Sequence, residues 1–129
     1  MLLYVAIGSA LGGIGRYLLG GLVQRLLATT FPAGTLLVNL SGSFLLGAIL
    51  RYAIDTPTLT PEMRALLTVG FCGGYTTFST FSYETVVLLR DGQWTRASIY
   101  VAASVLLSLL GTLLGFGFAR EVIALRERV

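Results

Sequence analysis

Long apolar segments that carry almost no charge constrain this chain more than any other feature. Of its 129 residues, 55% are hydrophobic and only 12% are charged, against about 25% charged in an average soluble domain. Nine arginines and six carboxylates could not cover the surface of a soluble protein of this size. We therefore predict an all-α membrane protein.

The composition also excludes several classes of function. Histidine, the usual general base near neutral pH and the commonest ligand of transition metals, is absent. The single cysteine, Cys72, cannot build a disulfide framework or a thiolate metal site. The arginines are scattered singly, which is typical of membrane interfaces rather than of nucleic-acid binding. With no nucleophile–base pair and no phosphate-binding P-loop, we do not expect an enzyme.

Four segments are long enough to cross a bilayer, which takes ~20 helical residues. We place these spans at about residues 2–27, 35–54, 61–90 and 96–119, within a single membrane domain over residues 1–129. The N-terminus has no basic region and no cleavage-site pattern, so we expect the first span to be retained. The turn Asp91–Gly92 ends the third segment, and Thr95 is expected to cap the fourth. The tail Arg120–Val129 is expected to continue the last helix into water.

The third segment is too long and too irregular for one straight helix. It begins with a strong start signal, in which Thr60 caps the helix, Pro61 takes the first position and Glu62 lies in the first turn. Its middle contains the pair Gly73–Gly74 followed by two threonines, and all four are poor helix formers. Irregular backbone at membrane depth is tolerated only inside protein or beside a wet cavity. We therefore predict that this third transmembrane helix is broken in mid-membrane.

The distribution of arginine gives weak information on topology. Four spans place both termini on one side of the membrane, together with the loop after the second span. That side carries five arginines: Arg51, Arg64, Arg120, Arg126 and Arg128. The other side carries three: Arg25, Arg90 and Arg96. A bias this small permits insertion in either orientation.

Two stripes of small residues indicate close helix packing. Gly8-x-x-x-Gly12 lies in the first span, and Gly111-x-x-x-Gly115 lies in the fourth. Such stripes let two helices approach each other in a membrane. They predict association of helices and identify no function.

Polar side chains inside the spans give the functional signal, because they are costly in a bilayer and usually face a partner or a wet path. In the fourth span they recur every four residues on one helical face, at Tyr100, Ser104, Ser108 and Thr112. These hydroxyls could bond back to their own helix or line a pore. In the second span Asn39 and Ser43 are also four residues apart, and Asn39 could simply bridge two helices.

The third span carries the densest polar group. Its hydroxyl residues are Thr76, Thr77, Ser79, Thr80 and Ser82. Among them stand Phe78 and Phe81, which share a helical face and in most proteins would pack in a core. Glu84 is the only carboxylate well inside a predicted span. It could pair with Arg16 or mark a helix end, or it could serve as a proton or cation site.

This set of side chains is rich in hydrogen-bond donors, which suits an anion. Amide and hydroxyl groups donate hydrogen bonds, and a phenyl ring has a positive edge. No lysine lies along the track to trap an anion by charge, and Arg16 could attract anions toward a vestibule without blocking the path. A small, strongly hydrated anion would need such a close lining to shed its water.

Three stretches of the chain, residues 12–17, 34–44 and 70–84, resemble the CrcB/Fluc family of fluoride channels. The third is the most specific, because it contains Gly-Gly-x-Thr-Thr-Phe-Ser-Thr-Phe-x-x-Glu from Gly73 to Glu84. The resemblance covers essentially the whole chain. It implies an antiparallel, dual-topology homodimer, multi-pass in a bacterial inner membrane. Its narrow pores would pass fluoride, reject chloride and export cytoplasmic fluoride passively.

The resemblance also implies roles for individual residues. Asn39 would donate to fluoride, and Phe78 and Phe81 would present ring edges to it. The whole expected fluoride pathway comprises Asn39, Ser43, Thr77, Phe78, Ser79, Thr80, Phe81, Glu84, Tyr100, Ser104, Ser108 and Thr112. Arg16 would belong to a vestibule. Backbone carbonyls of Gly73 and Thr76, from both subunits, would hold one structural sodium ion at the dimer axis.

Other functions stay open beside the channel. The first alternative is a small proton-coupled exporter with four spans that uses Glu84. Exporters of this kind depend on a carboxylate in their first span, whereas the first span here holds Arg16. A second alternative is an assembly subunit that transports nothing. A membrane enzyme is the least favoured.

Overall fold

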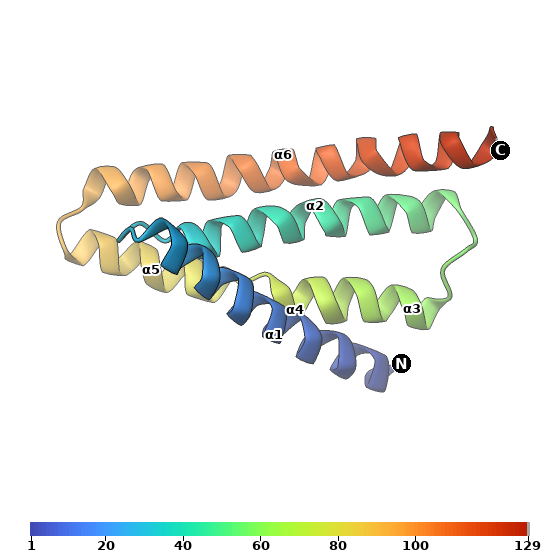
Figure 1. The fold of residues 1–129 in the computed structure, drawn as a ribbon, viewed down its shortest axis with the longest axis horizontal. Helices are drawn as coiled ribbons and strands as arrows, with labels where there is room; N and C mark the ends of the chain where they lie inside the picture. The colour runs from blue at the N-terminus through green and yellow to red at the C-terminus, as the bar shows by residue number, and fades with distance from the viewer. Residues whose placement is uncertain (129) are drawn as a thin grey trace.

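The computed structural model describes residues 1–128, and within them every regular element is helical (Figure 1). In chain order the elements are α1 (Leu2–Leu27), α2 (Ala33–Asp55), α3 (Pro61–Ala65), η1 (Leu66–Cys72), α4 (Gly73–Tyr75), α5 (Phe78–Arg90) and α6 (Trp94–Glu127). Both termini lie at one end of the molecule, and the α1–α2 and α5–α6 turns lie at the other (Figure 1). The prediction of an all-α fold is confirmed for the described residues.

Three of these helices, α1, α2 and α6, are long and apolar enough to cross a membrane. Much of their apolar surface faces outward: Leu106, Leu109 and Leu113 of α6 are each more than 60% exposed. Continuous apolar surface of this kind marks contact with lipid or with another protein. The sequence-based expectation of a multi-pass membrane protein is therefore confirmed.

The segment from Pro61 to Arg90 is divided into four elements. From α3 the chain passes through the wider π-helical turns of η1 into α4, which ends at Tyr75. Thr76 and Thr77 are extended, with ψ of 157° and 114°, and α5 begins at Phe78. Of the four poor helix formers, the two threonines thus leave the helix.

The glycine pair, by contrast, stays helical, which corrects our expectation. A Cβ atom at Gly74 would lie 2.5 Å from the carbonyl oxygen of Ser9 in α1. Gly74 therefore serves close packing between α4 and α1, and its low helix propensity is overridden by that contact. The interruption falls instead where another helix supplies partners for the backbone, as described below.

The helix ends follow the predicted signals in most places. The Thr60 hydroxyl accepts from the Met63 N–H at 3.2 Å, and Pro61 is the first residue of α3. Gly92, with φ of 73°, lies in the turn after α5. The prediction for Thr95 is wrong, because α6 begins at Trp94 without a side-chain cap. The tail is helical to Glu127, as expected, and Val129 lies outside the described residues.

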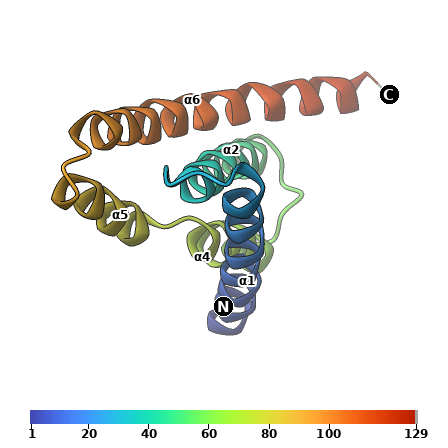
Figure 2. The ribbon, with the colours of Figure 1, turned by 60° about the vertical axis from the view of Figure 1, so that its left-hand side comes forward.

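The helices pack closely through glycine. α2 lies beside α6, while α1 crosses η1 and α4 (Figures 1 and 2). A Cβ atom at Gly115 of α6 would collide with the carbonyl oxygen of Phe44 in α2. A Cβ atom at Gly8 of α1 would likewise collide with the Leu66 carbonyl oxygen of η1. Both small-residue stripes therefore mark helix contacts, as predicted.

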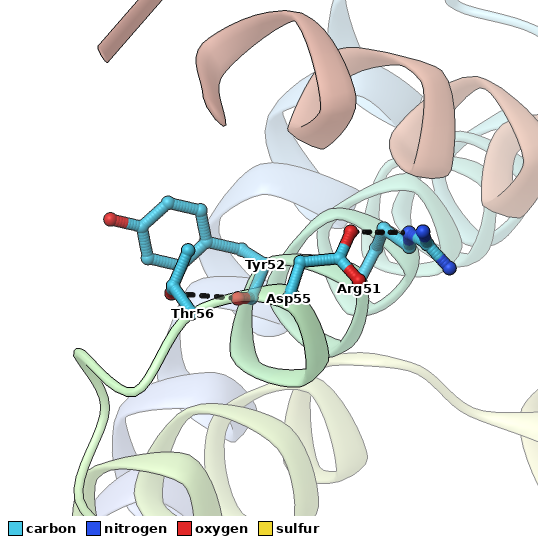
Figure 3. A network of polar contacts seen from close by, with 4 residues as sticks. All are labelled: Arg51, Tyr52, Asp55 and Thr56. Atoms are coloured by element: carbon cyan, nitrogen blue, oxygen red, sulfur yellow. Dashed lines mark hydrogen bonds and ion pairs between the residues drawn. The ribbon is translucent and has the colours of Figure 1, made fainter. Parts of the chain in front are cut away.

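A network of polar contacts lies at the end of the molecule where the termini lie (Figure 3). The Arg51 Nε and the Asp55 Oδ2 are 2.8 Å apart, one helical turn from each other. The Thr56 hydroxyl donates to the carbonyl of Tyr52 at 2.8 Å. The Tyr52 hydroxyl in turn accepts from Arg126 at 3.0 Å, which ties the extension of α6 to the end of α2.

Candidate functional site

A cavity of about 370 Å³ lies at the helix interruption, between α2, α5 and α6. The residues that line it are Asn39, Ser43, Thr76, Thr77, Phe78, Phe81, Ser104, Val105, Ser108, Leu109 and Thr112. Most are amide or hydroxyl residues, and none carries a charge. The structure therefore gathers eight of the twelve residues expected along the fluoride pathway around one space.

Asn39 of α2 supports the interruption directly. Its Nδ2 donates to the carbonyl of Thr77 at 3.0 Å, and its Oδ1 accepts from the N–H of Thr77 at 2.7 Å. Both polar groups of an extended residue are thus satisfied by one side chain, which matters because no water is available in a bilayer core. The expected bridge between two helices is present. The Nδ2 group carries a second hydrogen, for which residues 1–128 supply no acceptor, and Asn39 lines the cavity.

Thr77 caps α5 at the edge of the cavity. Its hydroxyl oxygen accepts from the N–H of Thr80 at 3.2 Å, and it also donates to the Thr80 hydroxyl at 3.0 Å. The Ser79 hydroxyl is 3.3 Å from the same oxygen. Ser79 and Thr80 are absent from the cavity lining. Both contact Thr77, which does line the cavity.

The hydroxyls of α6 differ from one another. Thr112 Oγ1 donates to the carbonyl of Ser108 at 3.1 Å, which is the back-bonding arrangement that we considered. Ser104 is buried, and its Oγ has no hydrogen-bond partner within residues 1–128. Buried hydroxyls in native structures almost always have a partner. An unpartnered one in a cavity wall indicates a place for water or a ligand.

The aromatic residues form a row that leads away from the cavity. The Phe81 ring centroid is 5.5 Å from that of Phe78 and 5.2 Å from that of Tyr100, with tilted planes in both pairs. Phe81 and Tyr100 are buried, as core residues would be, but Phe78 is 79% exposed. Core packing therefore explains Phe81 and does not explain Phe78.

Glu84 lies beyond this row and contacts hydroxyls rather than Arg16. Thr35 donates to its Oε1 at 2.8 Å, and Tyr100 donates to its Oε2 at 2.6 Å. Among residues 1–128, the one ion pair joins Arg51 and Asp55. The suggested Glu84–Arg16 pair is therefore wrong.

A second cavity, of about 280 Å³, begins at Glu84. It is lined by Gln24, Thr30, Pro32, Tyr83, Glu84, Val87 and Leu88. Phe81 and Tyr100 separate this space from the larger cavity at the interruption. Tyr100 links the walls of the two cavities, because its ring contacts Phe81 of the first and its hydroxyl donates to Glu84 of the second.

Comparison with known proteins gives this architecture a family. Residues 3–116 match the family described as CrcB-like protein, Camphor Resistance (CrcB). The chain belongs to the CrcB family. A relative from Geobacter sulfurreducens is 50% identical over 94% of this chain and 98% of its own length. A relative from Geobacter metallireducens is 48% identical over 92% and 95%. Both carry the name Fluoride-specific ion channel FluC.

Two residues of this CrcB chain were missed by the sequence analysis. Thr35, which donates to Glu84, precedes Asn39 by four residues, and Ser43 follows at the same spacing. That repeat on one face of α2 could have identified Thr35. Gln24 lines the second cavity, and its side chain contacts the backbone of the α1–α2 turn. The spacing of the spans predicted this turn, but no local pattern indicated that Gln24 contacts it. Arg16, expected at a vestibule, lines neither of the two cavities.

Proposed function

We propose that this protein is a fluoride channel, which lets fluoride leave the cytoplasm passively across a bacterial inner membrane. The observation that carries the proposal is identity of 50%, over almost the full length of both chains, with a protein named as a fluoride-specific ion channel. The fold and the uncharged donor lining of the cavity support it. No enzymatic or energy-coupling group is needed for such a function.

The larger cavity has the chemistry that a small anion requires. The unpartnered Ser104 hydroxyl and the remaining amide hydrogen of Asn39 are free to donate. The exposed Phe78 ring offers a positive edge. Neutral donors compensate an anion for its lost water without binding it too tightly to leave. We assign the twelve expected pathway residues to this route, with Ser79 and Thr80 acting through Thr77.

The proposed route continues past the aromatic row to Glu84. The Phe81 and Tyr100 rings separate the two cavities, and their edges would guide a partly dehydrated ion. The direction of flow is set by the gradient and by the membrane potential, worth ~2.3 kcal/mol per charge per 100 mV. Hydrogen fluoride enters as a neutral acid and dissociates inside, so the channel drains the trapped anion.

The segment from α3 to α5 supplies the third span in this proposal, beside α1, α2 and α6. None of its elements is long enough to cross alone, but together they run from one end of the molecule to the other (Figure 1). The amide of Asn39 supports the two extended residues that interrupt it. The whole chain then forms one membrane domain with four spans, the third broken in mid-membrane.

A second copy of the chain, inserted in the opposite orientation, completes the proposed channel. The cavity mouth carries Phe78, which is 79% exposed, so one chain does not enclose the route. The apolar faces of the long helices leave room for a partner. The weak arginine bias is what dual topology requires. We therefore propose an antiparallel homodimer with two pores.

A structural sodium ion at the dimer axis fits the residues that would hold it. The last carbonyls of a helix lack donors within that helix, and α4 ends at Tyr75. The N–H of Thr77, which would otherwise reach Gly73, is held by Asn39. Carbonyl oxygens are suitable ligands for a hard cation. The backbone carbonyls of Gly73 and Thr76 from both copies would bind one sodium ion. The attraction of these carbonyls to the positive ion would hold the two subunits together.

The exporter that uses Glu84 is the less favoured function, because the reported relatives are named as channels. The two are separated by fluoride efflux from proteoliposomes, read with an electrode in the presence of valinomycin and with chloride as control. A channel loses fluoride only when potassium movement balances charge, and it retains chloride. A proton-coupled exporter would respond to a pH gradient instead. Fluoride retention under both conditions would refute transport.

A further inference from the structure

Gln24 lies in the last turns of α1, and its side chain contacts the backbone of the turn that leads into α2. Its Nε2 donates to the carbonyls of Thr29 at 2.6 Å and Phe31 at 3.0 Å. Its Oε1 accepts from the N–H of Gly34 at 3.1 Å. One half-buried side chain thus fixes three backbone groups on both sides of Pro32.

The residues held by Gln24 contact the two donors to Glu84. The Phe31 ring meets the Tyr100 ring edge-on, with centroids 5.5 Å apart and planes at 84°. Thr35 directly follows Gly34 in the first turn of α2. Tyr100 and Thr35 are the residues that donate to the Glu84 carboxylate, at 2.6 and 2.8 Å. Gln24 also lines the cavity at whose wall Glu84 lies.

We infer that Gln24 is a positioning residue for the anion route. Its three hydrogen bonds set the α1–α2 turn, and through Phe31 and Thr35 they fix the orientation of Tyr100 and Glu84 between the two cavities. This inference rests on the proposed channel function. Gln24 itself need not touch the ion.

Gln24→Met tests the inference, because methionine matches glutamine in length but makes none of the three hydrogen bonds. We expect fluoride efflux to fall by about tenfold or more, since small displacements at a conducting or reacting site have effects of this size. The matched control is Gln93→Met in the α5–α6 turn, where among residues 1–128 the side-chain amide accepts only from Arg96. The control should conduct like the wild type.

Gln24→Glu supplies a readout that a purely structural role would not give. At about pH 7.5 the introduced carboxylate has no hydrogen to donate and is repelled by the carbonyl oxygens of Thr29 and Phe31. When it is protonated, its O–H can donate to one of these carbonyls, as the Gln24 amide does. Efflux relative to the wild type, each corrected for the leak of hydrogen fluoride from protein-free vesicles, should therefore rise when the same vesicles are brought to about pH 4.3, where about half of an ordinary glutamate is protonated. The other titratable groups facing this space are Tyr83 and Glu84 of α5, with Arg96 of α6 at the rim through Thr30. Because these groups are also present in the wild type, their effect on efflux cancels in the ratio.

The outcomes separate this inference from the proposed function. Wild-type efflux in folded Gln24→Met, or a pH-independent ratio for Gln24→Glu, would overturn the positioning role alone. If Gln24→Met does not fold, the Gln24→Glu ratio decides. Absence of fluoride efflux in the wild type would instead overturn the channel function itself.

Discussion

The α2–α6 contact and the helix interruption use opposite chemistry within the same small chain. At the contact, glycines such as Gly47 and Gly115 bring two regular helices together and leave no space between them. At the interruption, two residues leave the helix, a cavity opens and the Ser104 hydroxyl has no hydrogen-bond partner among residues 1–128. The first region is arranged for packing. The second leaves a buried hydroxyl available to a ligand or water, which supports the ion route that we propose.

This contrast predicts which substitutions stop assembly and which stop transport. Gly115→Leu should have the largest effect, because its side chain would collide with the Phe44 carbonyl. We expect a loss of about 3 kcal/mol or more in stability, so that little folded protein is recovered. Gel filtration in detergent measures this, and Gly117→Leu is the control because open space surrounds that position. Equal yields of the two variants would break the comparison.

Phe78→Ile should reduce fluoride efflux by about tenfold while leaving assembly intact, since the ring edge contributes about 1.4 kcal/mol to holding an anion. Phe78 is 79% exposed, so its packing contribution within the chain is small. Phe116→Ile, on the exposed side of α6 and outside both cavities, is the control. Unchanged flux in Phe78→Ile would remove this residue from the route.

Ser104→Ala tests the unpartnered hydroxyl and should have a smaller effect. One neutral hydrogen bond is worth about 0.5–1.5 kcal/mol, so fluoride efflux should fall by roughly twofold to tenfold. Ser98→Ala lies in the same helix outside both cavities and should leave efflux unchanged. Efflux equal to that of the wild type in Ser104→Ala would mean that the hydroxyl serves water alone.

Arg126→Gln should have the smallest effect of all. Arg126 donates to Tyr52 from an exposed position at the end of the molecule, far along α6 from the cavity. Exposed contacts of charged side chains contribute less than about 1 kcal/mol. Fluoride efflux should match that of the wild type, and thermal unfolding in detergent should shift only slightly. A large loss of efflux would show that this end of the molecule takes part in transport.

The sequence predicted features that depend on local spacing and missed those that depend on contacts between residues distant in sequence. The four-residue repeat on α6 placed Ser104 and Ser108 on one face, and both line the cavity. The start of α3 at Thr60 was likewise predictable from its cap. The helical state of Gly74 was not, because it depends on a contact with Ser9, distant in sequence.

The same limit applies to charge pairing. Glu84 was the one carboxylate well inside a predicted span, yet its partners, Thr35 and Tyr100, come from two other helices. Hydroxyl groups are uncharged, so a search for opposite charges cannot identify them as partners of Glu84. That search suggested Arg16 instead, which was wrong. Gln24 escaped notice for a related reason: its three partners are backbone groups.

Fluoride efflux through Asn39→Asp tests most directly whether the interruption is the conducting region. Aspartate has almost the same shape, but its carboxylate cannot donate to the Thr77 carbonyl and repels an anion in the cavity. We predict a folded, assembled protein in detergent whose fluoride efflux, measured beside the wild type with valinomycin present, is lost. Assembled Asn39→Asp protein with wild-type fluoride efflux would contradict the account.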